Sequence, residues 1–290
     1  MLLHPCHNNR RLEDRINLLW KNVALLSRKN GKFLRRQEIR LRNKVKKAFR
    51  KQMEWIVKEM KDLPIWPADE AQNRLDRNAN EGDIQEFANN IPYKEEVVMS
   101  IYSSSSGSMD KGGKTIVSEL KLGDFGISWS LANESAIRFL NNRRALELSN
   151  RQGTISDTTK TRILEILIDA AKSGQSYQKT AEFIRQQAEE GIFSQARAEM
   201  IATREIGVAY EEGKNIPLRD FQIAHPERPV EKFWQTVEDS KVTPTHRQNQ
   251  DAGWIDFAST FPGTGDLVAP GSDNPNCRCF TKYRIQPPAK

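Results

Sequence analysis

Apolar residues recur every three to four positions along most of the chain, and this spacing predicts a largely helical protein. Two such series occupy the N-terminal region, and each lies on one face of a helix. The first contains Leu12, Ile16, Leu19, Val23 and Leu26, and the second contains Leu41, Val45, Phe49, Met53, Ile56 and Met60. Asn30-Gly31 predicts a break between the two helices, and Pro64 and Pro67 predict the end of the second.

Residues 64–130, which follow this helix, are predicted to link the helices on either side rather than to form part of a packed core. Residues 64–130 contain several prolines and a run of serines at 103–106, followed by glycines at 107, 112 and 113. That composition is typical of a flexible linker. Residues 116–129 are expected to add a short extended segment. We therefore assign residues 64–130 to a connective region with a Ser/Gly linker.

Three further helices are predicted over residues 131–193, of which two carry start and stop signals. The first spans about 131–149. The second begins near Thr158 and ends at Ser173-Gly174, and the third begins at Ser176 and ends at Gly191.

The C-terminal third changes character. A helix is expected over residues 194–212, with Gly213 as its C-cap, followed by short strands at 221–223 and 230–237 and by a turn-rich sequence that leads to residues 254–257. Loops rich in Gly and Pro then lead to a closing strand that begins at Asn276. The predicted fold class is α+β, mainly helical in the N-terminal and middle regions, with a small α+β C-terminal domain. The predicted domains are 1–63, 64–130, 131–193 and 194–290.

Composition narrows the class of protein. The nine apolar residue types make up 37 % of 290 residues, and no apolar run approaches the length of a membrane-spanning helix. Three cysteines exclude a disulfide scaffold and suit a reducing compartment. The N-terminus lacks a hydrophobic signal core, so we expect a soluble protein that is not exported by an ordinary signal.

Positive charge is concentrated at the N-terminus. Residues 1–63 have a net charge of +12, whereas the whole chain has +7. The candidate nucleic-acid-binding residues are Lys44, Lys46, Lys47, Arg50 and Lys51. The alternatives are a solvated basic face on a helix whose apolar face packs on the body, and a membrane-surface helix. Two tryptophans in this arm are too few for an aromatic lipid-facing surface.

One group of side chains in the C-terminal third has metal-binding chemistry. His246, Cys277 and Cys279 are zinc-competent, and Asp239 or His225 is the candidate fourth ligand. A structural zinc ion would compensate for a thin core. The alternative is simple packing, with both cysteines on one side of a strand. A thiol-nucleophile triad of Asp239, His246 and Cys277 lacks a supporting local signature.

Three sequence blocks resemble one family. They are residues 197–205 with Ala209-Tyr210 and Gly213; Lys232-Phe233-Trp234 with Asp239, Val242, His246 and Gly253; and Pro270-Gly271 with Asn276-Cys277-Arg278-Cys279. Their order and intervals resemble the phage head morphogenesis family of Mu-protein-F-like minor head proteins, over about residues 160–285. This chain has Thr203-Arg204-Glu205 where the family usually has Arg-Thr-Glu.

The resemblance implies a non-enzymatic minor capsid protein of a tailed phage. It implies a place in the virion, inside the capsid or near the portal, after assembly in the host cytoplasm. Its implied partners are the portal protein, inner capsid or scaffold proteins and double-stranded DNA, with no membrane. The competing hypothesis is a metal-dependent DNA-processing enzyme that uses the His/Cys cluster.

Overall fold

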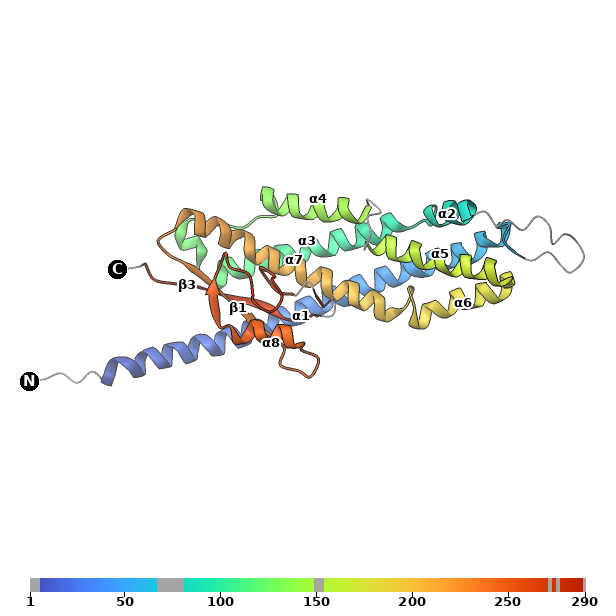
Figure 1. Cartoon of the computed structure of the whole chain (residues 1–290). Coiled ribbons are helices and arrows are strands. Elements are labelled where there is room, and N and C mark those ends of the chain that lie inside the picture. The colour runs from blue at the N-terminus through green and yellow to red at the C-terminus, as the bar shows by residue number, and fades with distance from the viewer. Residues whose placement is uncertain (1–5, 67–80, 149–153, 271–272, 275–276, 289–290) are drawn as a thin grey trace, which may run out of the picture.

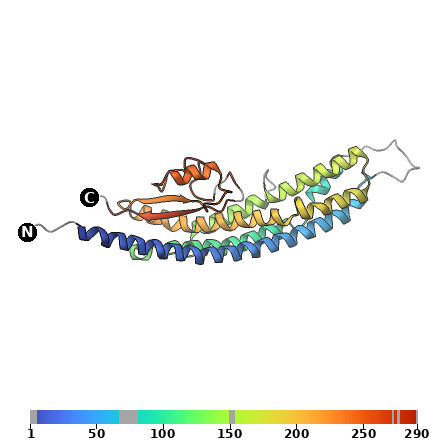
Figure 2. The same ribbon diagram turned by 90° about the horizontal axis from the view of Figure 1, so that it is seen from below.

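A computed structural model describes residues 6–66, 81–148, 154–270, 273–274 and 277–288, and within α1 it describes side chains from residue 31 onward. The helices form a long, curved bundle, and a small sheet lies against one part of it (Figure 1, Figure 2). The fold class is thus the predicted one, mainly helical with a small α+β C-terminal unit.

Eight α-helices are found in the described residues. They are α1 (Cys6–Glu59), α2 (Glu81–Asn89), α3 (Lys94–Glu119), α4 (Glu134–Leu148), α5 (Ile155–Ser173), α6 (Tyr177–Glu190), α7 (Gln195–Ala224) and α8 (Pro244–Asp251). Short 3₁₀ helices follow α1 at Met60–Asp62 and α3 at Leu122–Phe125. The helices predicted over 131–193 are confirmed as α4, α5 and α6.

Hydroxyl side chains define the helix starts in this part of the chain. Thr154, Ser176 and Ser194 each accept a hydrogen bond from the backbone N–H three residues later. This satisfies one of the unpaired donors at a helix N-terminus. At the other end of α5, Gly174 adopts a left-handed conformation with φ of 63°, as the sequence predicts.

The break predicted at Asn30-Gly31 is wrong, because α1 is one continuous helix of 54 residues. Its second apolar series forms the centre of the core, with Leu41, Val45, Phe49 and Ile56 fully buried. Packing along this face outweighs the low helix propensity of a single glycine. The predicted end near Pro64 is confirmed, since the 3₁₀ turn ends at Asp62.

The Ser/Gly linker predicted within residues 64–130 is also wrong. Residues 103–114 lie inside α3, and Ser104, Ser105 and Ser108 are buried. Serine hydroxyls hydrogen-bond the helix's own backbone, as Ser108 does with the Ser104 carbonyl at 3.1 Å. Residues 116–129 form the end of α3, a 3₁₀ turn and irregular structure, so the extended segment predicted there is absent.

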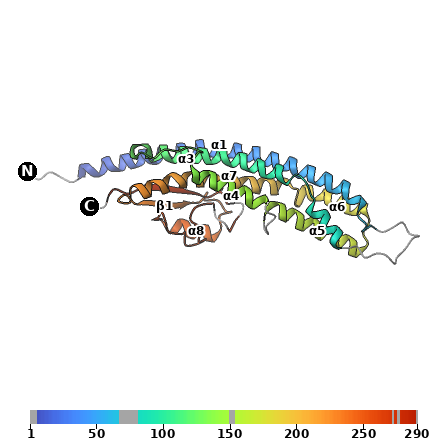
Figure 3. The ribbon, with the colours of Figure 1, turned by 90° about the horizontal axis from the view of Figure 1, so that it is seen from above.

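Small residues in this stretch allow two helices to approach closely. A Cβ atom at Gly112 would lie 2.1 Å from the Tyr210 carbonyl oxygen of α7, and one at Gly213 would lie 2.1 Å from the Met109 carbonyl oxygen of α3. Gly213 is therefore a packing residue, not the C-cap predicted from sequence. Helix α7 continues through it and through Pro217, so the strand predicted at 221–223 is helical. Figure 3 shows α3 and α7 alongside α1.

The sheet has three antiparallel strands in the order β2-β1-β3. They are β1 (Val230–Gln235), β2 (Trp254–Asp256) and β3 (Phe280–Ile285). Lys232 of β1 pairs with Ile255 on one side and with Tyr283 on the other. The alternation of β1 buries Val230, Lys232 and Trp234. The strands predicted over 230–237 and in the closing segment are thus confirmed with shorter bounds, whereas β2 was not predicted as a strand.

A buried ion pair joins the sheet to the bundle. Lys214 of α7 donates to the Glu211 carboxylate at 2.8 Å and to the Thr281 carbonyl oxygen of β3 at 2.5 Å. The Thr281 backbone N–H donates in turn to Glu211 at 3.2 Å. The predicted boundary at residue 194 therefore falls at the start of a helix shared by the bundle and the sheet unit. None of the helices in the described ranges has both the length and the apolarity that a membrane span requires.

Candidate metal centre

His246 is held in place by the first turn of α8. Thr243 caps this helix, Pro244 occupies its first turn, and the Thr243 hydroxyl accepts a hydrogen bond from the His246 backbone N–H at 3.4 Å. The imidazole is almost fully buried and packs on the Trp234 ring, with 5.2 Å between the ring centres. Its position is thus fixed by the helix start and by the sheet.

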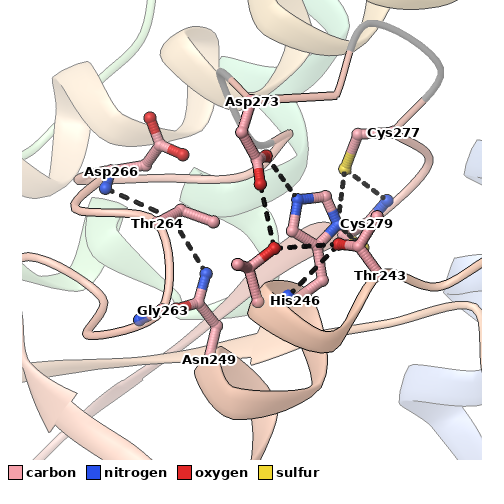
Figure 4. Close-up of polar contacts among 10 residues, drawn as sticks. Thr243, His246, Asn249, Gly263, Thr264, Asp266, Asp273, Cys277 and Cys279 are labelled. Atoms are coloured by element: carbon pink, nitrogen blue, oxygen red, sulfur yellow. Dashed lines mark hydrogen bonds and ion pairs between the residues drawn. The ribbon is translucent and has the colours of Figure 1, made fainter.

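An amide side chain of α8 holds the first part of the loop that follows β2. Asn249, fully buried, accepts a hydrogen bond from the Gly263 backbone N–H at 2.7 Å and donates to the Thr264 hydroxyl at 2.9 Å. A Cβ atom at Gly263 would lie 2.1 Å from the Thr245 carbonyl oxygen, so only glycine fits there. These contacts hold the loop beside His246 (Figure 4).

Two cysteine sulfurs converge on one nitrogen of the His246 ring. The Sγ atoms of Cys277 and Cys279 each lie 3.6 Å from Nδ1. One ligand atom from each of the three residues lies within 4.8 Å of the other two, and all three residues are buried. Neither cysteine forms a disulfide. The structure therefore brings together the three main residues of the predicted metal site.

Asp273 holds the opposite side of the His246 ring. Nε2 lies 2.8 Å from Asp273 Oδ1, and Oδ2 accepts a hydrogen bond from the Thr245 hydroxyl at 2.9 Å. Burial acts to raise the pKa of Asp273, but the bonds from His246 and Thr245 outweigh it, and the pKa is lowered. An ionised carboxylate only accepts hydrogen bonds, so Nε2 carries the proton. The other ring nitrogen, Nδ1, then faces the two sulfurs.

The two thiols oppose each other's ionisation. The pKa of Cys279 is raised well above its ordinary value, first by its contact with the Cys277 thiol and then by burial. Two N–H groups act in the opposite direction, those of the Trp234 indole and the Val237 backbone. A nearby cation would reverse the balance and favour both thiolates.

The cluster borders a groove between the C-terminal unit and α1. A cavity of about 860 Å³ is lined by His246, Cys277 and Cys279 on one side and by Arg35 and Glu38 on the other. A neighbouring cavity of about 340 Å³ is lined by both cysteines and by Gly207 and Lys214 of α7. One side of the buried cluster thus borders this groove.

Asp239 and His225, the predicted fourth ligands, lie outside the cluster. Asp239 forms an ion pair with Arg278 and accepts a hydrogen bond from the Lys241 backbone N–H, and the latter bond is the main cause of its lowered pKa. His225 ends α7 and lies 3.2 Å from the Phe125 carbonyl oxygen. Both side chains are engaged elsewhere because loop contacts, which periodicity does not encode, determine their positions.

Asp273 is the site residue that sequence reasoning missed. It lies in a Gly/Pro-rich loop in which no spacing rule ranks one polar residue above another. Its nearness in sequence to Asn276-Cys277-Arg278-Cys279 is the available signal.

The candidate nucleic-acid-binding residues differ in their surroundings. Lys44, Lys47 and Arg50 are exposed on α1, and Arg50 has only a 3.9 Å ion pair with Glu54. Lys46 donates to the Gln195 side chain at 2.9 Å. Lys51 is partly buried and forms a 2.9 Å ion pair with Glu96 of α3.

The first of the three sequence blocks consists of packing residues. Arg197, at the start of α7, donates to the carbonyl oxygens of Ile155 and Ile192 at 2.9 and 2.6 Å. Burial lowers its pKa to about 10. At the end of the block, the Glu205 carboxylate pairs with Arg143 of α4. This block joins α7 to the surrounding helices.

Comparison with known proteins gave a match to a protein family. Residues 161–282, from within α5 into β3, match the family model described as phage Mu protein F like protein. No curated protein and no solved structure matched the chain. The matched segment contains His246, Cys277 and Cys279, and it ends before the last residues of β3.

Proposed function

Because residues 161–282 match the family model described as phage Mu protein F like protein, we propose that this chain is a head morphogenesis protein, a minor capsid protein of a tailed phage that acts near the portal. The family match carries this proposal. The proposed partners are the portal protein and inner capsid or scaffold proteins, and the proposed location is the virion. The matched region includes two parts of the structure: the contacts of α7 with the other helices, and the sheet unit.

Particle analysis tests this proposal. Virions and procapsids purified from an infection are analysed by quantitative mass spectrometry, and the chain is expected in both at low copy number. A phage with a stop codon in this gene is expected to form shells of reduced infectivity, restored by the gene supplied in trans. Detection of the protein only in the soluble lysate would contradict the proposal.

A basic stripe on α1 supports contact with packaged DNA. At 100° per residue, Arg36, Arg40, Lys44, Lys47 and Arg50 fall within an arc of about 120°, and all five are exposed. This stripe lies opposite the face that buries Leu41, Val45, Phe49 and Ile56. Its length is about 21 Å at 1.5 Å per residue. The apolar face packs on the body, and the basic face is open to a polyanion.

Salt dependence of DNA binding tests the stripe. Five phosphate contacts predict that log K falls against log salt with a slope of about −4.5. Base preference is expected to be slight, because these side chains reach phosphates before base edges. Fluorescence anisotropy of labelled duplex DNA measures both quantities on the full chain.

The stripe variant replaces Arg36, Arg40, Lys44, Lys47 and Arg50 by glutamine, and its expected result is a large loss of affinity and of slope. A matched control removes the same charge from exposed residues elsewhere, namely Arg138, Lys172, Lys179, Arg185 and Arg247. Equal losses in both variants would show that net charge alone attracts DNA. The competing enzyme hypothesis requires DNA cleavage by zinc-loaded protein, which we expect to be absent.

A further inference from the structure

The two nitrogen–sulfur separations of the His/Cys cluster are those of a tetrahedral metal site. Zinc binds sulfur at about 2.3 Å and imidazole nitrogen at about 2.0–2.1 Å, so a tetrahedral angle places S and N about 3.5–3.6 Å apart. Both measured Nδ1–Sγ distances are 3.6 Å. Simple packing of a thiol against an imidazole does not require two equal contacts to the same lone pair.

We propose that Nδ1 of His246 and the sulfurs of Cys277 and Cys279 bind one zinc ion, with a solvent molecule as the fourth ligand. The described residues supply three ligand atoms here. The groove beside α1 gives solvent access to the side that they leave open. Two thiolates and one imidazole favour zinc over harder ions such as magnesium or calcium.

The residues around the cluster have the features of an outer ligand shell. Asp273 accepts the Nε2 proton of His246 and so directs the Nδ1 lone pair at the ion, as carboxylates do for metal-bound imidazoles. The Cys279 backbone N–H lies 3.4 Å from the Cys277 sulfur and donates to it. Binding of the ion releases the two thiol protons to solvent.

The ion would join two segments that are far apart in sequence. His246 belongs to α8, whereas both cysteines belong to the segment that leads into β3. Between them lies a long loop held mainly by Asn249 and by Lys232, which donates to the carbonyl oxygens of Phe257 and Leu267. Zinc is therefore expected to fix this loop to the sheet and to stabilise the C-terminal unit.

Cobalt substitution and X-ray absorption test the site in the full chain without an affinity tag. Untagged protein is expected to hold one zinc ion per chain, with absorption fine structure of two sulfurs at about 2.3 Å and two lighter atoms at about 2.0 Å. Cobalt(II) is expected to give the visible spectrum of a tetrahedral dithiolate site. Sub-stoichiometric zinc, or bound metal without sulfur neighbours, would overturn the proposal.

Matched variants locate the ligands. Cys277→Ser, Cys279→Ser and His246→Ala should each abolish the cobalt spectrum, whereas Cys6→Ser, the control for a lost thiol, should leave it unchanged. Asp239→Asn should also leave it unchanged. Asp273→Asn should keep the spectrum but lower zinc affinity by about 10–100-fold. An unchanged spectrum in Cys277→Ser, or its loss in Cys6→Ser, would assign the metal to other residues.

Discussion

At the scale of single residues, the buried pair of Lys214 and Glu211 connects the bundle to the sheet. Both side chains are nearly inaccessible to solvent. Lys214→Met leaves the Glu211 carboxylate buried without its cation, which typically costs about 3–5 kcal/mol of unfolding free energy. Urea denaturation of the full chain measures the loss. The control is Lys114→Met, since Lys114 pairs with Asp110 on the exposed surface of α3 and contributes less than about 0.5 kcal/mol.

The same variant predicts a pH dependence. Burial is the main cause of the raised pKa of Glu211, and Lys214 opposes this shift. Without Lys214 the pKa of folded Glu211 rises further, so the folded state binds a proton more tightly than the unfolded state. The stability that comes from this tighter proton binding is fully present below the pKa of Glu211 in the unfolded state. It is lost as the pH rises through the pKa of Glu211 in the folded state. The deficit of Lys214→Met should be larger at about pH 7.5 than at about pH 5; equal deficits would contradict this assignment.

Residue chemistry predicted part of the site. His246, Cys277 and Cys279 stood out because imidazole and thiol groups are uncommon in this chain and bind the same metals. Asp239 was chosen for its carboxylate, but its backbone turn and Arg278 direct it elsewhere. Asp273 became recognisable only when the loop conformation placed it 2.8 Å from the ring.

At the scale of elements, the crossing of α3 and α7 depends on glycine. Gly112→Ala and Gly213→Ala each place a methyl group against a backbone carbonyl of the other helix. Each is expected to lower the free energy of unfolding by about 1–3 kcal/mol. Thermal and urea denaturation measure the change.

Gly107→Ala is the matched control on the same helix. A Cβ atom there meets nothing within 4 Å, so the higher helix propensity of alanine should raise stability by up to about 1 kcal/mol. A stabilising effect of Gly112→Ala of similar size would show that the two helices do not approach closely.

The same serine and glycine residues explain why a linker was wrongly predicted from the sequence where α3 lies. Serine and glycine are typical of linkers, but they also permit close helix packing, and composition does not distinguish the two. Apolar periodicity was the better guide, since it predicted α5, α6 and the buried face of α1. It failed for α7 beyond Gly213, where burial against α3 outweighs both a glycine and a proline.

At the scale of the whole molecule, the helices on either side of residues 149–153 complete one core. Leu41 and Phe49 of α1 belong to the same buried cluster as Ile163 of α5 and Ala198 and Ile201 of α7. Residues 154–290 alone are therefore expected to remain unfolded or aggregated, although they include the family-matched region. When residues 154–290 are co-expressed with residues 1–148, the two fragments should co-purify, and their complex should have the circular dichroism spectrum of the full chain. A dispersed NMR spectrum from residues 154–290 alone would contradict this.

The elongation of the molecule is measurable in solution. A compact protein of this size would have a radius of gyration of about 19 Å. Helix α1 alone, with 54 residues, spans about 81 Å. Small-angle X-ray scattering should therefore give a radius clearly above the compact value, and agreement with 19 Å would show that α1 folds back.

The unbroken course of α1 has a mechanical consequence. A helix without a hinge transmits force along its axis, and its gentle curvature follows the bundle that supports it (Figure 2). A force applied at the N-terminal end of α1 is therefore transmitted to the far end of the bundle along one continuous helix, without passing through loops between shorter helices. In the capsid location proposed above, such a helix would keep its two ends at a fixed separation.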